Sequence, residues 1–518
     1  MTEQFQKHYK VTPRRSNPSL RQKNNTMGHL GDLIGSTSEG FAEALRFAAS
    51  SHLWNFIGIS LPTSSLLSHL ETSDINSSDV KRDSPEDCMQ NEESYVVKFE
   101  SEYINSSVPL YQEYWMAALK KDISRVQNRG LPGLIIPVCH SNLKTHTLSP
   151  PGQNSKPYAL WQELPQVKPV LPSLSAQEIQ LQEAMFEVIV SEASYQKSLI
   201  IALNVFQCSA ELKQILSRVQ HHVLFSNLKH VCRVSERFLQ DLESHLGQNV
   251  VMSQIGDVIL NHQKGFQQVY VPYLTNMMYQ EALITQLLLV VQGNKRFALI
   301  LKKLEKDPQC QRQTLKSFLV LPFQRITRMT LLLENIQKRT RGVCLDVPNL
   351  KEAIEAVRKI VEECDKSVQE MKRTELLVSL DKQVHFGSIK SIPLITRGRH
   401  LIQEGTLKQL QIGGKTGAII ISHNDLYVHL FNDLLLLSIR SGPRFVVEDH
   451  ALFPDHVRVD DVKTTILGLP SESFLLHLTK NQDKKRSSST LILAAQTRSE
   501  KETWIKLLSK KKTESVEM

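Results

Sequence analysis

Apolar residues recur three or four positions apart between Leu315 and Thr340, and this spacing constrains the fold more than any other feature of the sequence. The stripe consists of Leu315, Phe318, Leu319, Ile326, Met329, Leu332, Leu333 and Ile336. It predicts a helix with one face in a core and the other face free, and we expect Gln324 and Arg325 to be exposed on the free face. Because an interior proline costs a helix roughly 3 kcal/mol, we also expect a kink at Pro322.

The same helical periodicity runs almost without interruption from Ser175 to about Thr374. One predicted core stripe contains Leu181, Met185, Val188, Tyr195, Leu199, Leu203 and Phe206. Another contains Leu350, Ile354, Val357, Val361, Cys364, Val368 and Met371. Ser175 with Glu178 three residues later has the spacing of a capping box. This part of the chain is therefore predicted to be an elongated all-α bundle.

After about Ser388 the pattern changes to short apolar runs separated by Gly, Asn, Asp and Ser, which is typical of strands and turns. The expected strands are 405–410, 426–431, 434–439, 474–478 and 490–494, and an amphipathic helix from Ser499 carries Trp504. These elements predict a small β-barrel capped by a C-terminal helix. Gly414-Lys415-Thr416 lacks the earlier glycine of a phosphate-binding loop, since position 409 is Gln, so a hairpin turn is the better interpretation.

The N-terminal region, by contrast, has weak periodicity and is rich in Ser, Asn and Thr. We expect residues 1–100 to be mostly disordered, except for a short amphipathic helix from Phe41 to Ile57. A Pro-rich sequence from Ser149 to Pro172 is expected to act as a linker. Overall, the sequence predicts a multidomain chain with a disordered N-terminus, a helical bundle and a capped barrel.

Composition excludes several classes of function. The seven cysteines lie far apart, are odd in number and form no CxxC pair, which argues against a disulfide framework and against a zinc site. The N-terminus lacks the apolar segment of a signal peptide, and no run approaches the roughly 20 apolar residues of a membrane span. We found no HExxH, GxSxG or kinase pattern. A cytoplasmic protein without a metal, a cofactor or covalent catalysis is the resulting expectation.

Three segments resemble the Dbl-homology domain of guanine nucleotide exchange factors for Rho GTPases: 183–203, 224–243 and 315–340. The barrel with Trp504 in its last helix resembles a pleckstrin-homology domain. The resemblance implies a regulatory segment at 101–172, an exchange domain at 173–375, a linker at 376–398, a pleckstrin-homology domain at 399–512 and a tail at 513–518.

In this family an exchange factor binds the nucleotide-free GTPase more tightly than the loaded form, and by linkage it weakens nucleotide affinity. A glutamate on the first helix engages the switch one loop, and Glu187 matches that position. Gln324 and Arg325 lie in the matching segment at 315–340. Leu321 and Arg358 occupy two further GTPase-binding positions, at which many members carry a basic residue and Asn or Asp, respectively.

Several segments resemble the ephexin subgroup more closely: 160–165, 191–199, 321–328 and 109–121. In ephexins the LYQEY segment is an inhibitory helix that covers the GTPase surface and is released by tyrosine phosphorylation. Here Leu110, Tyr114 and Ala117 or Ala118 share a helical face, with Tyr111, Trp115 and Leu119 adjoining. The resemblance implies that Tyr111 is the principal switch and Tyr114 the second, both modified by a tyrosine kinase.

The expected partner is a Rho-family GTPase, RhoA first, with Rac and Cdc42 as further candidates. The formal charge of +9 fits an anionic membrane surface, and Lys408 and Lys415 predict weak peripheral lipid binding at the plasma membrane. Charge alone also fits nucleic acid, but aromatic residues do not alternate with the basic ones, so we expect no such partner. A non-catalytic scaffold that only binds GTPase or lipid is the main alternative. In the ephexin subgroup an SH3 domain commonly follows the barrel, and none is expected before Met518.

Overall fold

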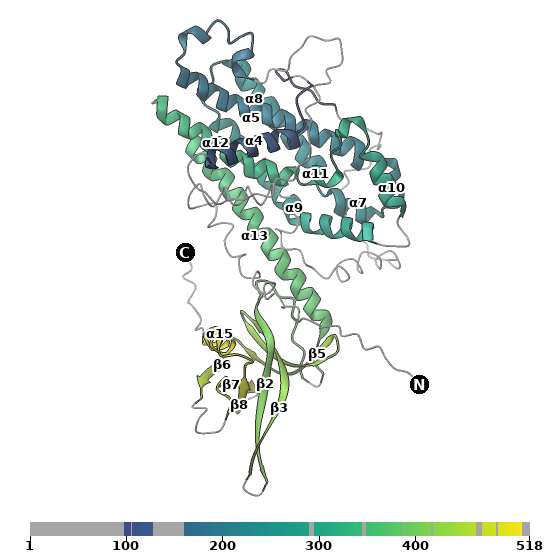
Figure 1. Cartoon of the computed structure of the whole chain (residues 1–518), viewed down its shortest axis with the longest axis vertical. Coiled ribbons are helices and arrows are strands. Elements are labelled where there is room, and N and C mark those ends of the chain that lie inside the picture. The colour runs from purple at the N-terminus through teal and green to yellow at the C-terminus, as the bar shows by residue number, and fades with distance from the viewer. Residues whose placement is uncertain are drawn as a thin grey trace, which may run out of the picture.

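A computed structural model describes residues 98–104, 106–127, 160–289, 295–343, 349–387, 389–415, 418–462, 469–482 and 485–509. A helical body and a strand-rich body lie one after the other along the long axis of the molecule, joined by one long helix (Figure 1). The predicted fold class is therefore confirmed. The predictions for residues 1–97, including the helix at 41–57, and for the tail at 513–518 lie outside the described residues.

The helical body contains the following elements in chain order: α4 (Tyr111–Gln127), η1 (Trp161–Glu163), η2 (Leu171–Ser173), α5 (Ala176–Ile201), η3 (Ala202–Gln207), α6 (Ala210–Ile215), α7 (Arg218–Phe225), α8 (Leu228–Gln248), α9 (Gly256–Leu289), α10 (Lys295–Leu304), η4 (Pro308–Cys310), α11 (Leu315–Leu319), α12 (Leu321–Val343) and α13 (Leu350–Gln383). Helix α5 packs against α8 and α12, and α9 packs against α8 and α13. Every residue of the first predicted stripe is buried. Ser175 caps α5 as predicted, since its hydroxyl accepts the Glu178 N–H and Glu178 accepts the Ser175 N–H.

The prediction of a kink at Pro322 is wrong. The chain instead forms two helices, α11 and α12, which are separated at Val320. Pro322 is the second residue of α12, in the first turn, where its missing N–H has no intrahelical partner to lose. A true interior proline is Pro272, in the middle of the 34-residue helix α9.

Residues 160–174 are part of the helical body and not a linker that ends at Pro172. The Trp161 side chain is fully buried, and its indole N–H donates to the Val250 carbonyl at 2.9 Å. The Glu183 carboxylate of α5 accepts the backbone N–H groups of Trp161 and Gln162 at 3.0 and 3.1 Å. Trp161 therefore anchors the chain just before the bundle begins.

In the part of the chain that the structure describes, the strand-rich body is one eight-stranded sheet with the order β1-β5-β4-β3-β2-β8-β7-β6. Its strands are β1 (Val384–His385), β2 (Leu401–Lys415), β3 (Ala418–Phe431), β4 (Leu434–Ser441), β5 (Arg444–Leu452), β6 (Val457–Asp461), β7 (Ser473–Gln482) and β8 (Lys485–Ala494). Lys415 at the end of β2 pairs with Ala418 at the start of β3, so Gly414 and Lys415 lie at the end of a hairpin, as predicted. The long β2–β3 hairpin extends away from the helical body (Figure 1). Helix α15 (Arg498–Leu508) buries Trp504 against the sheet.

Helix α13 runs on past Thr374, where we expected it to end, and reaches Gln383. Its predicted stripe weakens, because Val368 and Met371 are only half-buried. Burial then resumes at Leu377 and Leu380, which pack against Phe431, Leu434, Leu436, Phe445 and Val447 of the sheet. Thus the first part of the expected linker is helical and carries an apolar contact between the two bodies.

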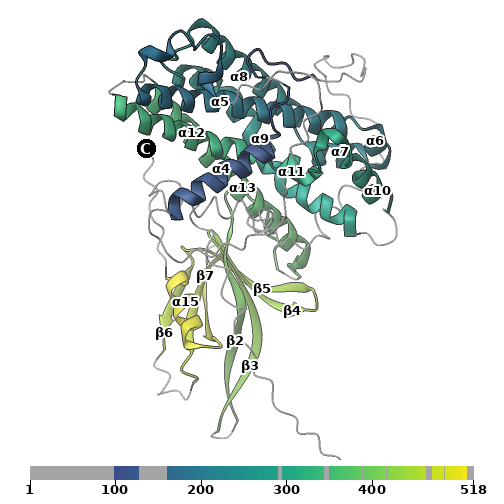
Figure 2. The ribbon, with the colours of Figure 1, turned by 45° about the horizontal axis from the view of Figure 1, so that its top comes forward.

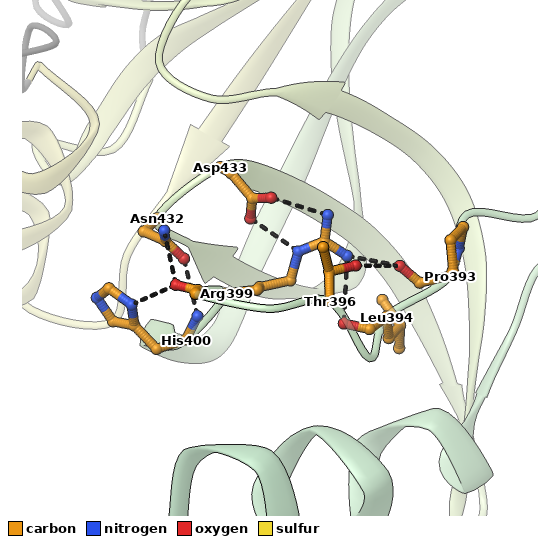
Figure 3. Close-up of polar contacts among 8 residues, drawn as sticks. Pro393, Leu394, Thr396, Arg399, His400, Asn432 and Asp433 are labelled. Atoms are coloured by element: carbon orange, nitrogen blue, oxygen red, sulfur yellow. Dashed lines mark hydrogen bonds and ion pairs between the residues drawn. The ribbon is translucent and has the colours of Figure 1, made fainter. Parts of the chain in front are cut away.

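The connection from α13 to β2 is held by Arg399 (Figure 3). Its guanidinium donates to both carboxylate oxygens of Asp433 at 2.8 and 2.9 Å, and to the carbonyls of Pro393 and Leu394 at 2.7 and 3.3 Å. Because one rigid, planar group satisfies four acceptors, it fixes the connecting segment to the turn between β3 and β4.

Candidate functional site

Helix α4 lies across α5 and α12, and Figures 1 and 2 both show it on the outside of the bundle. At this crossing the Tyr114 hydroxyl donates to the Glu187 carboxylate of α5 at 3.0 Å. The same carboxylate lies 3.7 Å from the Arg328 guanidinium of α12. The Glu187 side chain is 32% exposed and that of Arg328 only 9%, so the arginine supports the carboxylate from beneath. The residue that we expected to bind the GTPase is thus already engaged by the segment that we expected to inhibit it.

The predicted apolar face of α4 is confirmed. Tyr111, Trp115, Ala118 and Leu119 are buried, as is Leu110 just before the helix, whereas Ala117 is exposed. The Tyr111 ring is fully buried 5.4 Å from the Tyr195 ring of α5, and the Arg325 guanidinium carbon lies 6.0 Å from its centroid. Burial raises the pKa of the Tyr111 phenol, and it raises that of Tyr114 as well.

Polar contacts fix the position at which α4 begins. The backbone N–H of Tyr111 donates to the Ser198 hydroxyl at 2.9 Å, and the Lys197 ammonium donates to the Val108 carbonyl at 2.6 Å. Both partners lie near the end of α5. Because these bonds orient the first turn, they determine which side of α4 faces the bundle.

The expectation that Arg325 is exposed is wrong. Its side chain is fully buried, and its guanidinium donates to the Glu192 carboxylate at 2.7 Å and to the Ser191 hydroxyl at 3.0 Å. The other Glu192 oxygen accepts the Ser235 hydroxyl at 2.5 Å. Burial by itself lowers the pKa of the guanidinium, but the Glu192 carboxylate together with the nearby tyrosines Tyr111, Tyr270 and Tyr114 raises it overall. Such a paired, hydrogen-bonded charge is suited to hold α5 against α12.

The other predicted GTPase-binding residues are distributed unevenly. Gln324 is only 9% exposed, which contradicts the exposed position that we expected for it. Leu321 is fully buried in the helical core. Arg358 on α13 is 36% exposed and bridges to Glu334 of α12 at 2.7 Å.

Sequence reasoning missed Arg328 and Glu192, although both carried a signal. Arg328 follows Gln324 by four residues and so lies on the same side of the helix. Glu192 falls between Val188 and Tyr195 of the core stripe at helical spacing, and a carboxylate on a core face indicates a buried ionic partner.

The structure describes the side chain of only one of the two lysines that we expected to contact lipid. The Lys408 side chain is exposed on β2, whereas the side chain of Lys415 lies outside the described residues. Among the described residues, no cluster of three or more His, Cys, Asp or Glu side chains has an arrangement that could hold a metal ion. Within the same ranges, no helix is long and apolar enough to span a membrane.

A model of the RhoGEF domain matches residues 184–365, which extend from α5 into the first half of α13. The chain contains a RhoGEF domain. Mouse Rho guanine nucleotide exchange factor 5 is 40% identical over 424 residues, covering 78% of this chain and 26% of that relative. Mouse ephexin-1 is 37% identical over 358 residues, covering 68% of this chain and 49% of ephexin-1. The RhoGEF chain described here therefore spans between about a quarter and a half of these relatives.

Solved structures share the fold of this RhoGEF chain at lower identity. The PDZ-RhoGEF DH/PH domains in complex with GTP-γ-S-activated RhoA superpose with a TM-score of 0.52 at 23% identity, covering 66% of this chain and 96% of that chain. The DH/PH domains of p115-RhoGEF give 0.52 at 22% identity, covering 69% and 99%. The helical body is thus a Dbl-homology domain, and the sheet that follows it is pleckstrin-homology-like.

Proposed function

We propose that this protein accelerates GDP release from a Rho-family GTPase, with RhoA as the first candidate, and that α4 inhibits it by occupying the GTPase-binding surface. The observation that carries the proposal is the hydrogen bond from Tyr114 to Glu187. Glu187 matches the family glutamate that engages switch one, and a carboxylate satisfied by Tyr114 and Arg328 is not free to bind a switch loop. The RhoGEF domain and the RhoA complex of PDZ-RhoGEF support the choice of partner.

Inhibition in this account is a competition between two ligands for one surface. Helix α4 is covalently tethered, so its effective concentration is high and its intrinsic affinity can be modest. Phosphate on Tyr111 or Tyr114 adds about two negative charges. At Tyr114 the phosphate would meet the Glu187 carboxylate, and at Tyr111 it would have to enter a fully buried site. Either modification therefore favours the open state.

The burial of Tyr111 also sets the order of events. A kinase cannot reach a phenol with no exposed surface, so Tyr111 is modified only in the fraction of molecules in which α4 has already lifted. Phosphorylation then prevents α4 from returning. Phosphorylation thus traps the minor open state and shifts the population from the closed to the open conformation.

The experiment compares GDP release from RhoA, Rac and Cdc42 by the full chain, by a Tyr111→Glu variant and by a chain that begins at Leu160. The start at Leu160 removes α4 but retains Trp161, which the bundle needs. We expect slow release with the full chain and fast release with the other two. A scaffold without catalytic activity would instead bind nucleotide-free GTPase with unchanged release in all three.

A further inference from the structure

A second contact holds the inhibitory segment on the bundle, some distance from α4. We name residues 98–104 and 106–108, which precede α4, the latch. The Glu243 carboxylate of α8 is only 5% exposed and accepts three donors from the latch. They are the Ser101 hydroxyl, the Glu102 N–H at 3.1 Å and the Tyr103 N–H at 3.4 Å. The latch therefore docks on a buried anion, in addition to the burial of Ile104 and Val108 in the helical core.

The Tyr103 side chain lies beside this anion and over the end of α8. A methyl group added at Gly247 would lie 2.8 Å from the Tyr103 hydroxyl oxygen, so the phenol fits only because position 247 has no side chain. Gly247 belongs to the last turn of α8, the negative end of the helix dipole. Partial burial and the carboxylates of Glu102 and Glu243 raise the pKa of the Tyr103 phenol, which shows that the site disfavours negative charge.

Tyr103 also differs from the two tyrosines of α4 in its accessibility. Its ring packs on the edge of the helical core and remains partly exposed. Tyr111, by contrast, is fully buried, and the Tyr114 hydroxyl is engaged by Glu187. A kinase that approaches the closed molecule therefore meets Tyr103 before either of the others.

We propose that Tyr103 is a tyrosine phosphorylation site and that its modification releases the latch, which in turn makes α4 easier to lift. In the reaction the phenol oxygen attacks the γ-phosphorus of ATP, ADP leaves, and the phenolic proton passes to the kinase base. The product carries about two negative charges beside Glu243, Glu102 and the carbonyl end of α8. The phosphate is also too large for the space above Gly247, so charge and volume both expel the latch.

Release of the latch affects α4 because the two segments are continuous. Val108, at the end of the latch, accepts the Lys197 ammonium, and Tyr111 begins α4 three residues later. With the latch detached, α4 is held only by its own contacts and lifts more often. The inference rests on the proposed function for its effect on exchange, but the release itself is a property of this chain alone.

The test uses the full chain carrying Tyr111→Phe, which keeps the buried ring and removes that acceptor. It is treated with a purified tyrosine kinase catalytic domain and ATP, and the modified tyrosines are mapped by mass spectrometry. We expect phosphate at Tyr103, faster hydrogen exchange of the α4 amides, and GDP release from RhoA accelerated about fivefold or more. Adding Tyr103→Phe should abolish both changes. The inference is overturned if Tyr103 stays unmodified, or if modified chains keep α4 fully protected.

A second pair of variants tests the latch without a kinase. Glu243→Ala removes the acceptor of three hydrogen bonds and should speed hydrogen exchange in α4. Asp241→Ala is the matched control, because Asp241 lies on the same helix but faces His262 of α9. Equal protection in the two variants would refute the latch. If even the chain starting at Leu160 fails to release GDP from any Rho protein, the proposed function is wrong. Hydrogen exchange of the α4 amides would still show whether the latch holds α4 on the bundle.

Discussion

The Tyr114 hydroxyl donates to the Glu187 carboxylate across the interface between α4 and α5. One carboxylate oxygen thus links α4 to the position that, in the family, engages a GTPase switch loop. Under the proposed function, binding of Glu187 to α4 and binding of Glu187 to a switch loop exclude each other. Substitutions of Tyr114 and of Glu187 are therefore expected to have opposite effects on exchange, so mutation can separate inhibition from exchange.

We predict that Tyr114→Phe activates the full chain. The substitution keeps the ring and removes a hydrogen bond whose loss costs about 1 kcal/mol, so the open fraction should rise about fivefold. The measurement is GDP release from RhoA. The control is the chain that starts at Leu160, which lacks α4 and should set the upper limit of the release rate. Unchanged release from the full chain would show that this bond does not hold α4.

We predict that Glu187→Ala behaves in the opposite way, even though it breaks the same hydrogen bond. It frees α4 but removes the group that binds the switch loop, so exchange should stay more than tenfold below that of Tyr114→Phe. Binding of nucleotide-free RhoA should fall in parallel. A Glu187→Ala chain that is as active as Tyr114→Phe would exclude Glu187 from the GTPase interface.

We predict that the buried pair of Arg325 and Glu192 stabilises the helical body. Arg325→Met leaves the Glu192 carboxylate buried without its counter-charge, and we expect a loss of about 3–5 kcal/mol of unfolding free energy. Chemical denaturation monitors it. The double variant Glu192→Met/Arg325→Met should recover most of this loss, because no unpaired charge remains. A single variant as stable as the parent chain would contradict the assignment.

The strand-rich body should lose stability in mild acid because of His429. Its imidazole is fully buried near Tyr427 and Phe445, and burial lowers its pKa from 6.5 to about 4. The unfolded chain therefore binds a proton that the folded chain excludes as the pH falls from 6.5 towards 4, and stability declines over that window. The expected loss at pH 5 relative to pH 7 is about 2 kcal/mol.

Thermal unfolding at several pH values measures this loss, and His429→Phe is the matched variant. It preserves an aromatic ring in the apolar site and should remove the part of the stability loss between pH 7 and pH 5 that protonation of His429 causes. An identical pH dependence in the two chains would show that His429 is protonated equally in the folded and unfolded states.

Periodicity predicted the elements of this fold well, because stripes such as Leu181–Phe206 record burial directly. It placed the apolar face of α4 correctly for the same reason. It failed at Pro322, since sequence alone does not tell an interior proline from one in a first turn. It also failed at Arg325, because helical spacing assigns a charged residue to the surface unless its partner, here Glu192 on a distant segment, is known.

Two features could not be predicted from local pattern at all. The docking of Tyr103 on Glu243 and Gly247 joins residues about 140 positions apart, and the packing of Leu377 and Leu380 on the sheet joins two separate bodies. Both depend on which surfaces meet in three dimensions. The residues involved look like ordinary surface positions in the sequence.

The most direct test of the account is the rate of fluorescent GDP release from RhoA by the full chain and by its Tyr111→Glu variant at equal concentration. Occupation of Glu187 by α4 predicts slow release with the full chain and clearly faster release with the variant, approaching that of the chain starting at Leu160. Equal rates in all three, whether fast or slow, would contradict it.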